Sequence, residues 1–244
     1  MRKVCEVLGQ LPLFSGLDHD TYHTYCEGST IRTSWKGELI IAEGEGCKGV
    51  GIILEGQVAR QKYTASGEYT TLDLLGPGSV FGEDLIFSSH KRYPYSLEAL
   101  THVKWVMMYR EDLLSMIAKS PRLLSNYLAI LSDRVREQDQ RIHLLSQKTL
   151  RYKISCYLLQ RLEEDLHEQG KTLRDALSAP KTLSVELPVS KEVISKLLAM
   201  PRPSFSRELI SMEKDGLIHV DGRVIWLHDL RRLSCGLYED CEDE

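Results

Sequence analysis

The sequence predicts an α+β protein made of two folded parts joined by a long helix. Three patterns predict this fold: short strands separated by glycine across residues 30–109, an apolar repeat across residues 124–145, and two short helices followed by a hairpin across residues 190–226. A chain of 244 residues is long enough for two compact domains, each with its own core. We place the sensing domain, the connecting helix and the C-terminal domain at residues 1–118, 119–147 and 148–244.

The composition is that of an ordinary folded protein, with 42% hydrophobic and 27% charged residues. No window approaches the roughly 20 apolar residues that a membrane span needs, and the segment after Met1 lacks the apolar run of a signal peptide. We therefore expect a cytoplasmic protein without a membrane partner. The cysteines form no C-x-x-C pair, so we expect free thiols, no metal site and no disulfide framework. They are Cys5, Cys26, Cys47, Cys156, Cys235 and Cys241.

Charge is unevenly distributed along the chain, although the net value is only -4. Residues 1–146 carry 16 Lys and Arg against 18 Asp and Glu, whereas residues 147–233 carry 15 against 12. The last residues, 234–244, hold five acidic residues and no basic one. The C-terminal domain is thus mildly basic with an acidic tail, which is compatible with DNA binding through a local patch.

The first half reads as a sandwich or roll of short strands. Glycine-containing turns separate these strands, and at such turns glycine adopts backbone angles that strain other residues. The turns include Glu43-Gly44-Glu45-Gly46, Ser66-Gly67 and Gly76-Pro77-Gly78. The predicted strands are residues 39–41, 49–54, 56–58, 69–72 and 103–107.

A long helix follows, opened by Ser120 as a cap and Pro121 in the first turn. Its apolar positions are spaced by three or four residues, which keeps one narrow stripe on one side of a helix and is typical of a two-helix seam. Charged neighbours leave only that stripe apolar, so we expect a homodimer; packing of the helix on its own domain is the alternative. Gln138 is the single polar member of the stripe. The predicted dimer contacts are Leu124, Leu128, Leu131, Val135, Gln138, Ile142 and Leu145.

The C-terminal part begins with an amphipathic helix over residues 148–168 and a polar loop over residues 173–182. Ser190 can then cap a short helix that stops at Ala199-Met200-Pro201. Arg202 and Pro203 open a second helix, where proline in the first turn removes no hydrogen bond. Two short helices joined by a tight turn predict a helix-turn-helix.

The second of these helices has one apolar face and one exposed face. Phe205, Leu209 and Met212 recur at the helical period and should pack inward, whereas Arg207 falls on the opposite side. An arginine fork can bond guanine O6 and N7 together in the major groove, so Arg207 is the first candidate for base reading. Side chains near the helix N-terminus suit phosphates or base edges. The predicted DNA contacts are Ser190, Arg202, Pro203, Ser204, Ser206 and Arg207, with Ser211 also predicted on the exposed side.

A hairpin should follow this helix, because Asp221-Gly222 lies between two β-rich runs within residues 218–226. A helix-turn-helix followed by a hairpin is a winged helix.

Several motifs, taken in their order along the chain, make this sequence resemble the cyclic-AMP receptor protein and fumarate-nitrate regulator (CRP/FNR) superfamily over nearly its whole length. They are Leu54-Glu55-Gly56-Gln57-Val58, Gly76-Pro77-Gly78-Ser79-Val80-Phe81-Gly82-Glu83, the dimer helix, and Arg202-Pro203-Ser204-Phe205-Ser206-Arg207-Glu208. The resemblance implies a β-roll of the jelly-roll, cyclic-nucleotide-binding-like type. It also implies an effector pocket beside the dimer helix, two recognition helices on a palindromic site of double-stranded DNA, and RNA polymerase as a partner.

The departures from the family pattern concern the effector. Cyclic-AMP binders carry an Arg-Ser pair that holds the phosphate, and those positions are Tyr93 and Pro94 here, with Arg92 one residue away. Glu83, which contacts the ribose in such binders, is interpreted as a local helix cap. We therefore expect an unidentified small-molecule effector, an aromatic compound or an acid, rather than cyclic AMP. The predicted effector contacts are Gly82, Glu83, Tyr93, Tyr95, Ser96, Gln138 and Asp139, of which Tyr95 and Ser96 are chosen for their aromatic and hydroxyl groups.

In the recognition helix, Pro203 replaces the glutamate of the cyclic-AMP branch, and Ser206-Arg207 matches the fumarate-nitrate branch. Cys5 and Cys26 do not supply the cysteine cluster that the iron-sulfur branch needs.

Two alternatives remain open from the sequence. The same architecture can be gated by cysteine oxidation, which the cysteines motivate. A cupin-like metalloenzyme is the alternative from another class, since a β-roll can hold a metal, but the histidines show no cluster on the strands. We expect a protein that is not an enzyme and that has no catalytic residues.

Overall fold

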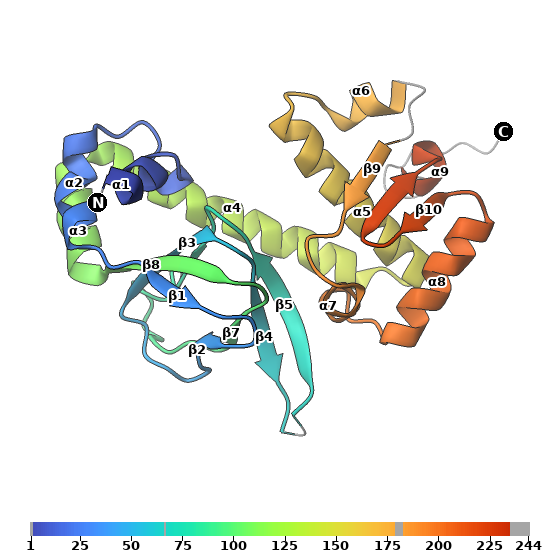
Figure 1. The fold of residues 1–244 in the computed structure, drawn as a ribbon, viewed down its shortest axis with the longest axis horizontal. Coiled ribbons are helices and arrows are strands. Elements are labelled where there is room, and N and C mark those ends of the chain that lie inside the picture. Colours follow the sequence, from blue (N-terminus) through green and yellow to red (C-terminus); the bar gives the residue numbers. More distant parts are fainter. Residues whose placement is uncertain (1, 66, 179–182, 235–244) are drawn as a thin grey trace. The chain divides into compact units, whose positions relative to one another are not determined.

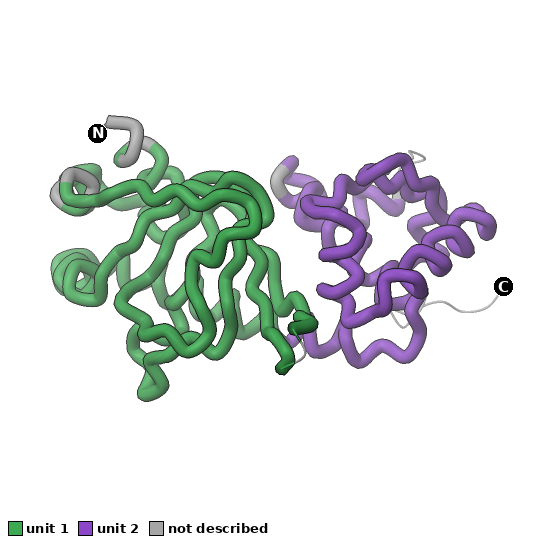
Figure 2. The backbone as a smooth tube through the Cα atoms, turned by 60° about the horizontal axis from the view of Figure 1, so that its bottom comes forward, with its two compact units in different colours: residues 1–138 green, residues 139–244 purple. Residues whose placement is uncertain are grey.

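The computed structural model describes residues 2–65, 67–178 and 183–234, and the chain divides into two compact units, residues 1–138 and 139–244 (Figure 2). Within the described residues, no helix combines the length and the apolar character needed to cross a membrane. The acidic tail lies outside the described residues, as do Cys235, Cys241 and the side chain of Cys26.

The first unit contains the predicted roll of antiparallel strands (Figure 1). One 4-stranded sheet has the order β1-β8-β3-β6 and the other has the order β2-β7-β4-β5. Buried side chains of both sheets, including Ile53, Phe81 and Leu97, form one shared core. The strands are β1 Arg32–Ser34, β2 Leu39–Ile41, β3 Gly49–Glu55, β4 Val58–Tyr63, β5 Tyr69–Leu75, β6 Val80–Phe81, β7 Ser96–Ala99 and β8 Val103–Tyr109.

Helices before and after the strands cover the roll at one end (Figure 1). They are α1 (Arg2–Gly9), the short 3-10 helix η1 (Pro12–Phe14), α2 (His19–Gly28) and α3 (Arg110–Lys119). Their apolar side chains share a second core with Val50, Val106 and other side chains of β3 and β8. The strand patterns of the sequence gave no sign of the helices that precede β1.

Helix α4 (Pro121–Ser146) has two apolar sides. Ser120 Oγ accepts a hydrogen bond from the Leu123 N–H at 3.3 Å, and so caps the helix as predicted. Leu123 and Tyr127 are buried in the second core of the roll. The predicted stripe remains largely uncovered in the single chain: the exposed fractions are 40% for Leu124, 53% for Leu128, 61% for Val135 and 64% for Ile142.

Two members of the predicted stripe differ from the others. Leu131 is half-buried because it packs against the second core, and Leu145 is half-buried as well. Packing of α4 on its own domain and an uncovered stripe are therefore both present on one helix.

The second unit contains the predicted winged helix-turn-helix (Figure 1). A 3-stranded sheet has the order β10-β11-β9, and the turn between β10 and β11 places Gly222 and Arg223 at its centre, because Asp221 pairs with Val224. The positive φ of Gly222, 58°, suits this tight turn. The elements are α5 Leu150–Glu168, α6 Leu173–Ser178, β9 Leu183–Glu186, α7 Lys191–Leu197, α8 Arg202–Lys214, β10 Ile218–Asp221, β11 Val224–Leu227 and α9 Leu230–Ser234.

The predicted polar loop at residues 173–182 was wrong in its first half, where α6 forms. Thr172 and Asp175 cap this helix reciprocally: the Thr172 N–H donates to Asp175 Oδ2 at 2.9 Å, and the Asp175 N–H donates to Thr172 Oγ1 at 3.3 Å. Burial of Leu173 and Ala176 then holds α6 in place.

Candidate functional sites

Helix α8 presents one buried and one exposed face, as the sequence predicted. Phe205, Leu209 and Met212 are each at most 4% exposed, and α8 packs against α7 and α5. Ser190 is the N-cap of α7, where its side chain accepts a hydrogen bond from the Val193 N–H. Burial of the apolar face fixes which side of α8 is left for another molecule.

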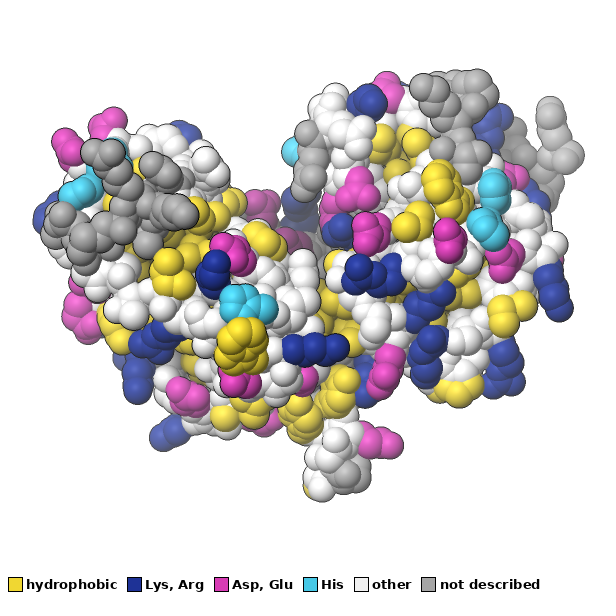
Figure 3. Space-filling view, in the orientation of Figure 1, with side chains coloured by type: hydrophobic (Ala, Val, Ile, Leu, Met, Phe, Trp, Pro, Cys, Tyr) yellow, Lys and Arg dark blue, Asp and Glu magenta, His cyan; other side chains and the backbone are white. Residues whose placement is uncertain are grey.

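The exposed N-terminal half of α8 carries the predicted DNA contacts. Arg202, Pro203 and Arg207 are exposed, whereas Ser204 and Ser206 are half-buried. Arg202 donates a hydrogen bond to Ser206 Oγ, and Arg207 Nε donates to the Pro203 carbonyl at 3.3 Å. Figure 3 shows Lys and Arg side chains gathered over the region of α7 and α8. This face can therefore offer cationic donors to an anionic groove.

A partly exposed arginine anchors the other end of α8. Arg151 of α5 donates to Glu208 Oε1 at 2.7 Å and to Ser211 Oγ at 2.8 Å, and it pairs with Asp215 at 2.6 Å. The prediction that Ser211 belongs to the exposed reading face was wrong, because Arg151 reaches over it and leaves it half-buried. Glu208 is likewise engaged within the fold.

A buried cluster of charges lies in the roll beside α4. The Glu83 carboxylate is 2% exposed, with Oε1 lying 3.7 Å from Arg60 NH2 of β4 and 3.7 Å from Arg134 Nε of α4. Arg134 NH2 also pairs with Asp73 Oδ2 of β5 at 2.6 Å. The Tyr127 hydroxyl donates to the backbone carbonyl of Glu83 at 2.6 Å. Glu83 is thus tied to α4 through both its side chain and its backbone.

The environment of this cluster controls its charge state. Burial raises the pKa of Glu83 above its ordinary value, although the neighbouring Arg60 acts in the opposite direction. The Arg60 guanidinium lies over the Tyr95 ring, 4.4 Å from the centroid. Among the described residues, Arg60 Nε and Glu83 Oε2 find no hydrogen-bond partner. The buried Arg60 guanidinium therefore lacks some of its hydrogen bonds, which lowers the free energy of unfolding unless another group supplies them.

The structure separates the predicted effector contacts into four groups, one of which is the pair Gly82 and Tyr93. Glu83 and Tyr95 belong to the buried cluster, so the interpretation of Glu83 as only a local helix cap was wrong. Ser96 Oγ accepts a hydrogen bond from the Glu43 N–H at 3.0 Å and is buried. Gln138 and Asp139 are exposed, and none of the cluster contacts described above involves them.

Gly82 and Tyr93 fit together closely. Gly82 has a φ of 79°, and a Cβ atom there would lie 2.5 Å from the Tyr93 hydroxyl and 2.8 Å from the Gly49 carbonyl. The Tyr93 side chain is 1% exposed and belongs to the core shared by the two sheets. The Tyr93 ring is therefore packed in the core between the two sheets, and it offers no cation there.

The sequence reasoning missed Arg60, Asp73 and Arg134. A signal existed for Arg60, which lies directly after the apolar pair Val58-Ala59 within a strand and is 4% exposed. Arg134 continues the buried side of α4 one helical repeat after Tyr127, at i+7. Charged residues at positions where the pattern requires apolar ones were the observable sign.

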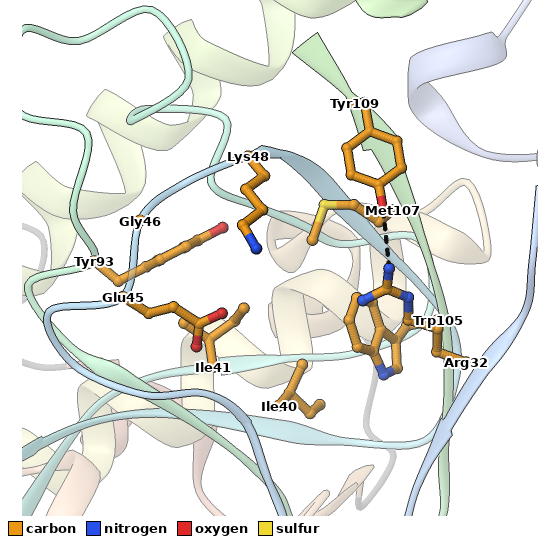
Figure 4. A pocket seen from close by; sticks show the side chains of 10 residues that line it. All are labelled: Arg32, Ile40, Ile41, Glu45, Gly46, Lys48, Tyr93, Trp105, Met107 and Tyr109. Carbon is orange, nitrogen blue, oxygen red and sulfur yellow. Dashed lines mark hydrogen bonds between the residues drawn. The ribbon is translucent and has the colours of Figure 1, made fainter.

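A small cavity of about 130 Å³ lies elsewhere in the roll, shared by β1, β2, β8 and the turn before β3. Figure 4 shows Glu45, Lys48 and Tyr93 pointing into it, and Arg32 donates to the Tyr109 hydroxyl at 3.1 Å on its wall. Ligand pockets for drug-sized molecules have volumes of about 300–1,000 Å³. This cavity is therefore too small for a nucleotide.

The winged helix-turn-helix with its exposed helix α8 places the chain in the class of DNA-binding transcription regulators. Residues 32–120 match the family model of the cyclic nucleotide-binding domain, and residues 154–235 match that of the Crp-like helix-turn-helix domain. The chain belongs to the CRP/FNR family of transcription regulators, and its helix-turn-helix is the DNA-binding element of that family.

Relatives of known function agree with this assignment. The "Cyclic AMP receptor protein" of Thermus thermophilus is 30% identical over 155 residues, which are 64% of this chain and 71% of the relative. The "CRP-like cAMP-activated global transcriptional regulator" of Mycobacterium tuberculosis is 25% identical over 229 residues, covering 94% of this chain and 97% of the relative.

Solved structures share the fold. A CooA mutant from Carboxydothermus hydrogenoformans superimposes with a TM-score of 0.71 at 18% identity, covering 95% of this chain and 94% of that one. FixK2 from Bradyrhizobium japonicum gives a TM-score of 0.67 at 21% identity, covering 85% of this chain and 96% of that one. The α+β architecture predicted from the sequence is confirmed.

Proposed function

We propose that the chain is a homodimeric regulator that binds a palindromic operator and responds to a small molecule other than cyclic AMP. The observation that carries the proposal is the exposed cationic end of α8, where Arg202 and Arg207 lie on the side opposite the buried face. The uncovered apolar stripe of α4 supports a second copy of the chain as its occupant. A two-fold dimer presents two recognition helices and therefore reads two related half-sites.

The roles along α8 follow from position and chemistry. Arg207 reads a base, because its guanidinium is exposed on the outward face and a planar fork matches guanine O6 and N7. Arg202, Ser204 and Ser206 lie in the first turns of α8, where side chains and free backbone N–H groups suit phosphate oxygens.

The DNA proposal is tested by selecting fragments from a random-sequence library with the full-length protein. The selected fragments should contain two inverted half-sites with centres about 10 base pairs apart. Arg207→Ala should weaken binding to the selected fragment by about 1–3 kcal/mol and change binding to random DNA little. Arg136→Ala is the matched control, because Arg136 is an exposed arginine on α4. Equal losses on both kinds of DNA would remove Arg207 from base reading, and selected fragments without two-fold symmetry would contradict the dimeric reading mode.

The effector proposal depends on the cluster around Glu83. Tyr93 and Pro94 offer no cation for a cyclic phosphate, and the Glu83 carboxylate is engaged by Arg60 and Arg134. An effector suited to these residues is a small anion, such as a carboxylic acid, that takes the place of Glu83 beside the two guanidinium groups. Binding of this anion would change the ion pairs of Arg134 and thereby the packing of α4 against the roll.

Cyclic AMP itself is the second candidate, since relatives that are 25% and 30% identical bear cyclic AMP in their names. Titration calorimetry with cyclic AMP and with a panel of carboxylic acids separates the two. We expect no heat of binding from cyclic AMP, and binding of an acid that Arg60→Met abolishes. Saturable binding of cyclic AMP would overturn the proposal. If all ligands fail but DNA binding responds to oxidation, gating by thiols replaces the effector.

The chain acts through DNA and partner proteins rather than through catalysis, in line with relatives that are transcription regulators. We propose RNA polymerase as a partner of the DNA-bound dimer. Transcription in vitro from a promoter that carries the selected site should change when the protein is added, and no change in either direction would contradict this partner.

A further inference from the structure

Three side chains with metal-ligating atoms converge on the N-terminal helices. Cys5 of α1 and His19 and His23 of α2 each place one ligand atom so that all three lie within 4.8 Å of one another. The two histidines are one helical turn apart, and their ring centroids are separated by 4.8 Å. No step in the proposed DNA or effector function uses these residues.

The donor set identifies the class of metal. One thiolate and two imidazoles are ligands that zinc, cobalt and other borderline or soft transition metals prefer, whereas magnesium and calcium prefer oxygen ligands. In a tetrahedral zinc site, Zn–N and Zn–S distances near 2.0 and 2.3 Å place two ligand atoms about 3.5 Å apart. Side-chain rotations that move the ligand atoms by about 1 Å would therefore bring these three atoms to coordinating distance from one metal ion.

The surroundings allow a metal to enter and be held. The His19 side chain is 55% exposed and gives access from solvent, whereas Cys5 is 7% exposed and ends the site on its inner side. The carboxylate of Asp20 lies near the same histidine, with Oδ1 3.9 Å from His19 Nδ1, and adds negative charge beside the three ligand atoms.

We propose that Cys5, His19 and His23 form a binding site for one zinc-class transition-metal ion, with a fourth position left for water or another ligand. A metal bound here would link α1 to α2. Its ligand Cys5 packs in the same core as Leu123 and Tyr127 of α4. The sequence already held a sign of this site, because a His-x3-His spacing on a helix puts both imidazoles on one face.

The test uses cobalt(II) as an optical probe of the reduced, full-length protein. We expect one cobalt per chain, with the intense visible bands of tetrahedral cobalt and a near-ultraviolet band from thiolate-to-cobalt charge transfer. Zinc should displace the cobalt. Cys5→Ser should remove the charge-transfer band, and His19→Gln or His23→Gln should weaken cobalt binding by at least about tenfold.

Matched controls come from the same chain. Cys156→Ser changes another buried cysteine and His90→Gln another surface histidine, and both should leave the cobalt spectrum unchanged. If Cys5→Ser unfolds, the two histidine variants still decide, because neither side chain is buried. Cobalt bands of full strength in the His19→Gln/His23→Gln double variant, or no tetrahedral spectrum in the native protein, would overturn the site.

Discussion

Replacing Leu128 with alanine should weaken the proposed homodimer without unfolding the chain. Leu128 is 53% exposed in the single chain and lies in the middle of the uncovered stripe on α4. The substitution removes three carbons, each worth about 0.8 kcal/mol when fully buried, and about half of that burial is available to dimerisation. Each copy therefore loses about 1.3 kcal/mol and the dimer about 2.5 kcal/mol. Since about 1.4 kcal/mol corresponds to a tenfold change, the dimer dissociation constant should rise about 60-fold.

Sedimentation equilibrium of the protein without DNA measures this change directly. Ile210→Ala is the matched control, because Ile210 is also 53% exposed but lies on α8, away from the stripe. Its dimer dissociation constant should equal that of the native protein. The reasoning is refuted if Leu128→Ala and Ile210→Ala dimerise with the same affinity, or if the native protein sediments as a monomer at micromolar concentration.

Three other substitutions test single features of the fold. Ala199 has a φ of 51°, a left-handed backbone conformation that strains alanine but not glycine, so Ala199→Gly should raise the free energy of unfolding by about 0.5–1 kcal/mol in urea denaturation. Ala129→Gly within α4 is the control and should lower the free energy of unfolding. A lower free energy of unfolding in both variants would contradict backbone strain at Ala199. Burial raises the pKa of Glu83 in the folded state, so its contribution to the free energy of unfolding is full below pH 4.5 and is lost as pH rises through the folded-state pKa. Glu83→Gln should remove this contribution from the pH profile of stability, and identical pH profiles of the variant and the native protein would argue against a raised pKa of Glu83. Arg151→Met should lower stability by about 1 kcal/mol and weaken operator binding, because α8 loses the three contacts of Arg151; unchanged values would show that the anchor is dispensable.

The winged helix was predictable because its signals are local. Ser190 caps α7, Arg202 and Pro203 open α8, and the Asp221-Gly222 pair lies at the hairpin. Each of these signals acts within one turn of a helix or one turn of the chain, so the residue types alone carry it. The register of the hairpin shifted by one residue relative to the motif, because pairing between Asp221 and Val224 sets which residues occupy the turn.

The sequence pointed to part of the buried cluster around Glu83 but did not reveal its chemistry. A family motif pointed to Glu83 and side-chain chemistry pointed to Tyr95, and the structure places both in the buried cluster. Arg60 and Arg134 are separated from Glu83 by 23 and 51 positions, and only the packing of β4 and α4 around the turn after β6 brings them to it. The partners of a buried charge are set by tertiary packing, so they cannot be predicted from spacing along the chain.

The sequence by itself determined the family, the recognition helix and the apolar stripe of α4, because periodicity and capping depend on neighbours a few residues apart. Only the tertiary structure decided that Leu131 packs on the roll while Leu128 and Val135 remain uncovered. The same holds for Cys5 and the histidines of α2, which come from separate helices and meet because both pack on one core. Local sequence determines the helices and strands, whereas the packing between them determines which side chains come together in one site.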